Sequence, residues 1–158
     1  MRIFLAIVLI TLSVIGCGRP VPPQRAALPD RYFVAEAALH YMFDQHSRYI
    51  GERDGRLCYV IKRGEFTEPL LASFAGYTPT VTATTNLQIS KDTGLAIDKA
   101  TGKAVKSWTV EVREIQGDSA IAYVSWYSSG LAAGGHTIYL KRKNNKWVVV
   151  SEKMDWVS

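Results

Sequence analysis

Apolar positions divide the chain into a short leading run and a longer, patterned remainder. Residues 3–15 are almost entirely apolar and follow a single cation, Arg2. The run has the length of a secretory signal, roughly 7–15 residues, and is shorter than the 18 or more that a membrane-spanning helix needs. It therefore predicts an export signal over residues 1–16 that is removed from the mature protein.

The residues after this signal do not have the composition of a folded segment. Residues 17–29 contain four prolines and few large apolar side chains. The prolines oppose a helix, and little apolar surface is present to bury. We therefore expect an extended tether with a rise of about 3.1 Å per residue, followed by one folded domain over residues 30–158.

The first part of the expected domain is helical. Residues 31–48 carry apolar side chains at three- and four-residue spacing, and Asp30 is placed to cap this helix. A strand is expected over residues 56–62, and a short second helix over residues 67–74, capped by Thr67. The core stripe of the first helix is expected to consist of Val34, Ala37, Ala38, Tyr41 and Met42.

The rest of the pattern predicts strands. Residues 80–89 are rich in threonine and branched side chains, and turn residues over 90–106 predict a hairpin or a long loop. In the last third, apolar and polar residues alternate with the period of a half-buried strand. The strands are expected over residues 108–113, 120–127, 136–143 and 147–156, with a small-residue loop over 128–135 and a tight hairpin at Asn144-Asn145.

Charge argues against one class of partner. Removing Arg2 with the signal leaves 18 Lys and Arg against 14 Asp and Glu, a formal net charge of +4. Nucleic-acid binding would need these cations to be clustered, so no nucleic-acid partner is expected. The only local cluster, Lys141-Arg142-Lys143 with Lys146, flanks the expected hairpin. It is either a solvated hairpin tip or a patch for a membrane or another polyanion.

The two cysteines have different expected fates. Cys58 lies in the apolar, strand-prone run 57–61 and is expected to be a buried, inert thiol. Cys17 follows Val14-Ile15-Gly16, and this arrangement resembles the lipobox of bacterial lipoproteins. The resemblance implies that Cys17 is acylated, becomes the first residue and anchors the protein in a membrane. Glycine at position 18 resembles the residue that follows the acylated cysteine in lipoproteins sent to the outer membrane, so the protein is expected on the periplasmic face of that membrane. If the source is Gram-positive, the expected location is the cell membrane.

The order of elements, a long helix, a strand, a short helix and then antiparallel strands, resembles the nuclear-transport-factor-2-like family. Residues 124–140, 146–150 and 154–158 also resemble the tails of short uncharacterised bacterial proteins. The resemblance implies an α+β fold in which N-terminal helices pack on a curved, cone-like antiparallel sheet. The ketosteroid isomerases of this fold use a tyrosine and two aspartates, for which Tyr41, Asp44 and Asp155 are the candidates, although no local motif singles them out.

One polar pair on the first helix is a candidate for chemistry. His40 and Asp44 are four residues apart and share a helix face, so they could bind a metal or act as acid and base. His46 lies off that face, and no acidic or histidine cluster nearby adds a third ligand. A structural hydrogen bond is therefore the favoured interpretation, and neither a metal nor another cofactor is expected.

Aromatic residues crowd the expected last strands. Because side chains alternate across a strand, some of them must face opposite ways, lining either a pocket or an exposed surface. Core packing is the default for such residues. The candidates for ligand binding are Tyr41, Trp126, Tyr127, Tyr139 and Trp156.

These observations favour a membrane-anchored envelope lipoprotein with one non-catalytic domain, which binds a small apolar ligand or a protein partner. Two alternatives stay open. An enzyme using the cone cavity would need an ionisable group with a shifted pKa in a largely apolar pocket. A structural or assembly component would instead show an exposed apolar patch without a deep cavity.

Overall fold

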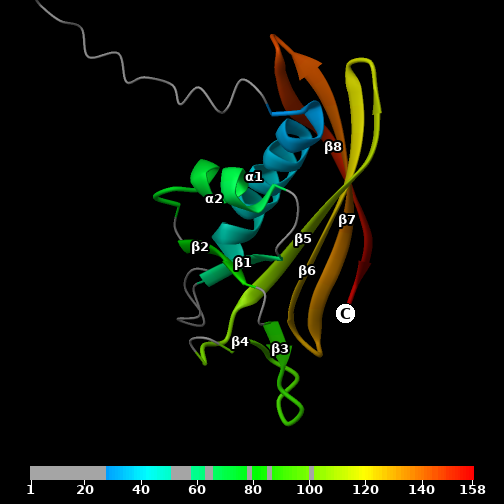
Figure 1. Cartoon of the computed structure of the whole chain (residues 1–158). Coiled ribbons are helices and arrows are strands. Elements are labelled where there is room, and N and C mark those ends of the chain that lie inside the picture. The colour runs from blue at the N-terminus through cyan, green and yellow to red at the C-terminus, as the bar shows by residue number, and fades with distance from the viewer. Residues whose placement is uncertain (1–27, 51–57, 63–65, 78–79, 85–86, 100–101) are drawn as a thin grey trace, which may run out of the picture.

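The computed structural model describes residues 28–50, 58–62, 66–77, 80–84, 87–99 and 102–158. Within these residues two helices and eight strands form (Figure 1). The elements are α1 (Asp30–Ile50), β1 (Cys58–Lys62), α2 (Thr67–Ser73), β2 (Thr80–Thr84), β3 (Leu87–Ile89), β4 (Ala96–Asp98), β5 (Lys106–Gln116), β6 (Ser119–Ser129), β7 (Ala132–Lys143) and β8 (Lys146–Val157). The mixture of helix and sheet confirms the α+β class, with strands predominating.

Six strands form one sheet in the order β2-β1-β5-β6-β7-β8, and β3 pairs with β4 in a separate antiparallel ribbon. Strands β5 to β8 are antiparallel neighbours, as expected. Strand β1 differs, because it runs parallel to both β2 and β5. The expectation of an antiparallel sheet fails there because helix α2 lies in the connection from β1 to β2, and a crossover of this kind returns the chain in the same direction.

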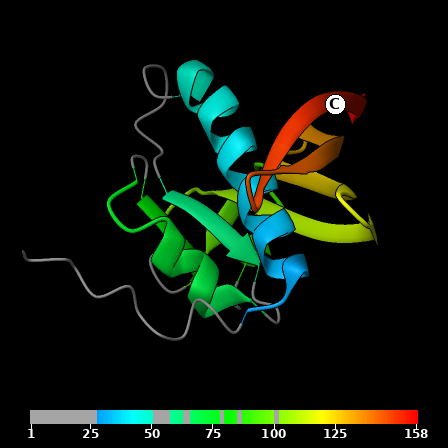
Figure 2. The ribbon, with the colours of Figure 1, turned by 90° about the horizontal axis from the view of Figure 1, so that it is seen from above.

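Helix α1 lies across one face of β5–β8 (Figures 1 and 2) and contacts all four of these strands. We call this covered face the inner face of the sheet and the opposite one the outer face. Leu39 and Phe43 are fully buried in addition to Val34, Ala38 and Met42 of the expected stripe, whereas Ala37 and Tyr41 are only partly buried. The buried face is wider than expected because α1 is covered from two directions, by the sheet and by Phe74 after α2, whose ring lies 4.8 Å from that of Phe43.

The strand ends also differ from the sequence pattern. The expected loop over residues 128–135 is instead a tight hairpin, since β6 extends to Ser129 and β7 begins at Ala132. The expected strand over residues 80–89 is divided between β2 and β3, which belong to different sheets. The hairpin at Asn144-Asn145 is confirmed, with φ values of 50° and 59° that asparagine tolerates.

The two expected helix caps are wrong. Asp30 is the first residue of α1, and its carboxylate pairs with Arg142. Thr67 is the first residue of α2, and Phe66 before it makes no side-chain capping bond. In the part of the chain that the structure describes, neither helix combines the length and the apolar character needed to cross a bilayer.

Several predictions concern residues that lie outside the described part of the chain. These are the export signal, Cys17 and the tether up to residue 27. Cys58 begins β1, but its side chain is likewise outside the description. Leu28 is described, and it packs against the core.

Candidate functional site

The five aromatic candidates divide between the two faces of the sheet. Tyr41 on α1 and Trp126 on β6 lie at the inner face and pack against the core. Tyr127, Tyr139 and Trp156 lie on the outer face, as the alternation of side chains along a strand requires. The candidates therefore do not form one site, and each face has to be considered separately.

On the inner face, a chain of polar contacts links α1 to three strands. The Tyr41 hydroxyl donates to Oε2 of Glu152 at 3.0 Å, and Oε1 of Glu152 lies 2.6 Å from Nδ1 of His136. The Trp126 indole N–H donates to Nε2 of His136 at 3.4 Å. Because Nε2 accepts this proton, the ring proton of a neutral His136 belongs on Nδ1, the atom that faces the Glu152 carboxylate.

This polar chain runs from the buried interior to the edge of the sheet. His136 is only 2% exposed, whereas the Glu152 side chain reaches the edge of the sheet and is 24% exposed. Burial, followed by the hydrogen bond to Glu152 and its negative charge, raises the pKa of Tyr41 above its usual value. The cluster therefore keeps a phenol protonated and an imidazole oriented, an arrangement that fixes α1 against β7 and β8.

Lys106 lies next to this chain and is the strongest electrostatic anomaly of the described residues. Its ammonium nitrogen lies 3.7 Å from the Trp126 ring centroid and 5.0 Å from that of Trp108. The residue is 7% exposed, and burial lowers the pKa of its amine from 10.5 to about 7. Among the described residues no hydrogen bond or ion pair reaches this amine, so the two indole faces are its only polar compensation there.

Sequence reasoning missed both Lys106 and His136, although a signal for each exists. Lys106 has the same parity as Trp108, which begins the alternating apolar set of β5. His136 has the same parity as Ile138 and Leu140, both buried on the inner face of β7. A polar residue in phase with a buried set is expected to point into the core, and this would have identified both.

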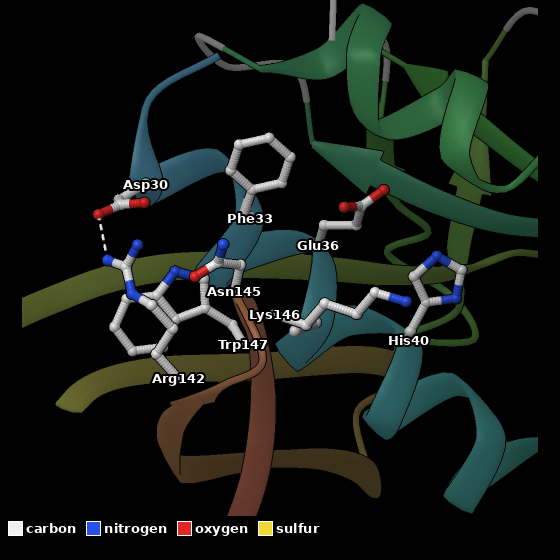
Figure 3. Close-up of a pocket in the computed structure, with 9 residues that line it drawn as sticks. Asp30, Phe33, Glu36, His40, Arg142, Asn145, Lys146 and Trp147 are labelled. Atoms are coloured by element: carbon white, nitrogen blue, oxygen red, sulfur yellow. Dashed lines mark hydrogen bonds and ion pairs between the residues drawn. The ribbon is translucent and has the colours of Figure 1, made fainter. Parts of the chain in front are cut away.

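A groove opens between the first half of α1 and the turn that joins β7 to β8 (Figure 3). Its volume is about 520 Å³. Arg142 closes one end by donating to Asp30 at 2.5 Å while its guanidinium lies 4.6 Å from the Trp147 ring centroid. The remaining lining residues are Phe33, Glu36, Ala37, His40, Asn145 and Lys146.

The pair His40 and Asp44 serves packing between α1 and the segment after α2. The His40 ring stacks on Phe74 at 4.1 Å, and Asp44 accepts a hydrogen bond from the Tyr77 hydroxyl. Neither contact is that of a metal ligand. Over the described ranges, no group of three or more His, Cys, Asp or Glu side chains is arranged to hold a metal ion.

The three residues suggested by the ketosteroid isomerase pattern do not meet. Tyr41 bonds Glu152 and Asp44 bonds Tyr77, whereas Asp155 lies on the outer face and accepts from Thr137 at 2.6 Å. That hydrogen bond, followed by the nearby ammonium of Lys153, lowers the pKa of Asp155. The trio therefore offers no common site for a substrate.

On the outer face the aromatic candidates make structural contacts. The Tyr127 hydroxyl donates to the Gly94 carbonyl at 2.8 Å and so connects β6 to the β3–β4 ribbon. Trp156 donates to the Tyr123 hydroxyl, while Tyr139 is 37% exposed.

One end of the molecule carries large apolar side chains in contact with solvent. Leu131, at the turn between β6 and β7, is 91% exposed. At the end of β8, Met154, Trp156 and Val157 are 58%, 45% and 62% exposed. Backbone hydrogen bonds between Ala133 and Ser158 hold these two segments side by side. We call Leu131, Met154, Trp156 and Val157 the apolar end.

Comparison of the chain with protein-family models, with curated proteins and with solved structures finds no match.

Proposed function

We propose that this chain is a lipid-anchored envelope protein whose domain binds a protein partner and performs no catalysis. The observation that carries the proposal is the apolar end, where four large apolar side chains are 45–91% exposed. Single exposed apolar residues are ordinary, but a group of them on adjoining segments is typical of an interaction surface.

The position of β8 in the sheet adds to this argument. It is an edge strand of twelve residues, paired with β7 on one side only within the described sheet. Met154 pairs with His136 and Val157 with Gly134, so both extend the inner face, whereas Trp156 contacts Tyr123 on the outer face. A partner with an extended apolar segment would thus find both backbone groups and side chains to bind, as in strand addition.

The anchor rests on the sequence around Cys17. We propose that its thiol is acylated and that the mature protein is held at the periplasmic face of the outer membrane. Several acyl chains, each contributing about 0.8 kcal/mol per buried methylene, retain a protein where one chain would not. Replacement of Cys17 by Ser tests this step: the wild type should fractionate with membranes and carry acyl mass at its first residue.

We further propose that the domain has the cone-like nuclear-transport-factor-2-like architecture. The support is that α1 crosses the inner face of four antiparallel strands and contacts each of them. Strand β1, which runs parallel to its neighbours, would be a local departure from the antiparallel sheet of that architecture.

The partner is tested by placing a photo-crosslinking side chain at Leu131 in the lipidated protein in cells, with Glu111 as the matched exposed position on the outer face of β5. A discrete crosslinked species is expected from position 131 and not from position 111. It should disappear when Met154→Ser and Val157→Ser, at the two more exposed positions, are added in a protein that still melts normally. Equal crosslinking from both positions, or persistence in the double variant, would contradict the proposal.

A second candidate function is ligand binding in the groove between α1 and the β7–β8 turn. A volume of about 520 Å³ lies within the usual range of ligand pockets, roughly 300–1,000 Å³. Its lining mixes Phe33 and Trp147 with charged side chains, which favours a ligand that carries both apolar and charged groups over a purely apolar one. Native mass spectrometry of the protein extracted from membranes would reveal such a ligand as a fixed added mass.

An enzymatic role has weaker support. Lys106 has the lowered pKa that such a role would require, but it is not among the residues that line this groove.

A further inference from the structure

The start of the domain and the basic β7–β8 turn lie at the same end of the molecule (Figure 1). The Arg142 side chain joins them by donating to Asp30, the first residue of α1, at 2.5 Å. Leu28, directly before α1, packs against the core. The point at which the chain from Cys17 reaches the domain is therefore held beside this turn.

Arg142 is engaged in contacts within the domain, whereas the lysines around it are exposed to solvent. Its guanidinium is occupied by Asp30, by Asp118 at 3.4 Å and by the Trp147 ring. Lys141, Lys143 and Lys146 are exposed, and among the described residues no ion pair links them to a carboxylate. Arg142 balances one of the two carboxylates it touches, so the turn still presents a surplus of positive charge.

We infer that Lys141, Lys143 and Lys146 dock this end of the domain onto anionic phospholipid headgroups beside the anchor. The inference rests on the proposed lipid anchor, since that anchor brings the turn to a membrane. Each lysine near an anionic surface is worth about 1 kcal/mol, about a fivefold change in binding. Asn144 and Asn145 at the tip offer no apolar group for insertion, so the attraction is electrostatic and falls as salt is added.

The length of the tether favours this orientation over the inverted one. The strand β8 has twelve residues, and at about 3.4 Å per residue it extends about 40 Å from the basic turn to the apolar end. At the rise of about 3.1 Å per residue expected for the tether, the segment from Cys17 to Leu28 spans about 35 Å, which falls short of that distance. Docking through the basic turn needs no such span, and it leaves the apolar end directed away from the lipid, where a protein partner can reach it.

The test uses the mature-length chain, residues 17–158, with Cys17→Ser so that no acyl group contributes. Its sedimentation is measured with vesicles of phosphatidylcholine alone and of phosphatidylcholine mixed with phosphatidylglycerol. The triple variant K141Q/K143Q/K146Q is compared with K91Q/K99Q/K103Q. The second variant loses the same charge from exposed lysines around the β3–β4 ribbon, at the other end of the molecule.

We expect binding only to the vesicles that contain phosphatidylglycerol, and release at high salt. Neutralising the turn should weaken this binding about 100-fold, as three steps of about fivefold each imply, whereas the distal variant should change it less than about threefold. Absence of binding by the parent chain, equal losses in the two variants, or full binding by the turn variant would each overturn the inference. Because no lipid is attached in this experiment, its failure is distinct from a failure of acylation at Cys17 or of crosslinking at Leu131.

Discussion

The indole N–H of Trp156 donates a 2.8 Å hydrogen bond to the hydroxyl of Tyr123, across the strand that separates them. The intervening residue of β7 is Gly135, which pairs with Trp156. A Cβ atom on Gly135 would collide with the Tyr123 hydroxyl and the Trp156 indole. Aromatic side chains from the two neighbouring strands thus cover a glycine, a contact that supports the strand in this glycine-rich segment.

Gly135→Ala should therefore be destabilising. Overpacking of this kind costs about 1–3 kcal/mol, because the two aromatic side chains must leave their favoured positions. Urea unfolding measures the change. Gly130→Ala is the matched control, since a Cβ there meets no atom within 4 Å. Equal losses in the two variants would show that the contact over Gly135 is unimportant.

Lys106 should make stability depend on pH in the alkaline range. Folding lowers the pKa of its amine from 10.5 to about 7, so between these values the unfolded chain binds more protons than the native one. The contribution of Lys106 to stability therefore rises from pH 7 to 10.5 and is lost as the pH falls toward 7.

Lys106→Met should remove this dependence and stabilise the protein near neutral pH. Replacing a buried ion pair by apolar side chains of similar size often gains about 1–4 kcal/mol, and a buried ammonium without an ion-pair partner should give a gain of this order. Unfolding in urea across the pH range 7 to 10.5 is compared with that of the parent and of Lys103→Met, an exposed control. Parallel curves for the parent and Lys106→Met would contradict the assignment.

Glu152 should contribute more to the free energy of unfolding than an ordinary surface carboxylate does. Its removal deprives the Tyr41 hydroxyl of its acceptor and buried His136 of the carboxylate 2.6 Å from its Nδ1. We expect Glu152→Ala to lower the free energy of unfolding by about 1–3 kcal/mol. Glu111→Ala breaks only an exposed contact of 3.7 Å with Arg113 and should change stability by about 0.5 kcal/mol or less. Similar losses in both variants would mean that the inner polar chain does not fix α1.

The sequence predicted the parts of the fold that local periodicity determines. The long helix and the strands β5 to β8 follow from apolar spacing, and the turn at Asn144 follows from its tolerance of positive φ. The parallel pairing of β1 could not be predicted, because it depends on where the chain returns after α2. The burial of Lys106 was likewise hidden, since the residue type favours the surface and only its phase relative to Trp108 indicates the inner face.

The last prediction concerns where the folded domain begins. Leu28 packs against the core and the Pro29 carbonyl accepts from the Tyr32 amide at 2.9 Å, so the domain includes two residues before α1. A chain over residues 28–158 should melt at the same temperature as one over residues 17–158, because the expected tether has little apolar surface to bury. A chain over residues 30–158 should lose about 1–2 kcal/mol, a part of what full burial of a leucine contributes. Leu28→Ser in the chain over residues 28–158 should reproduce most of that loss, which separates the side chain from the backbone contact. If removal of residues 17–27 alone lowers the melting temperature, the tether packs on the domain and cannot act as a free spacer between the lipid and the basic turn.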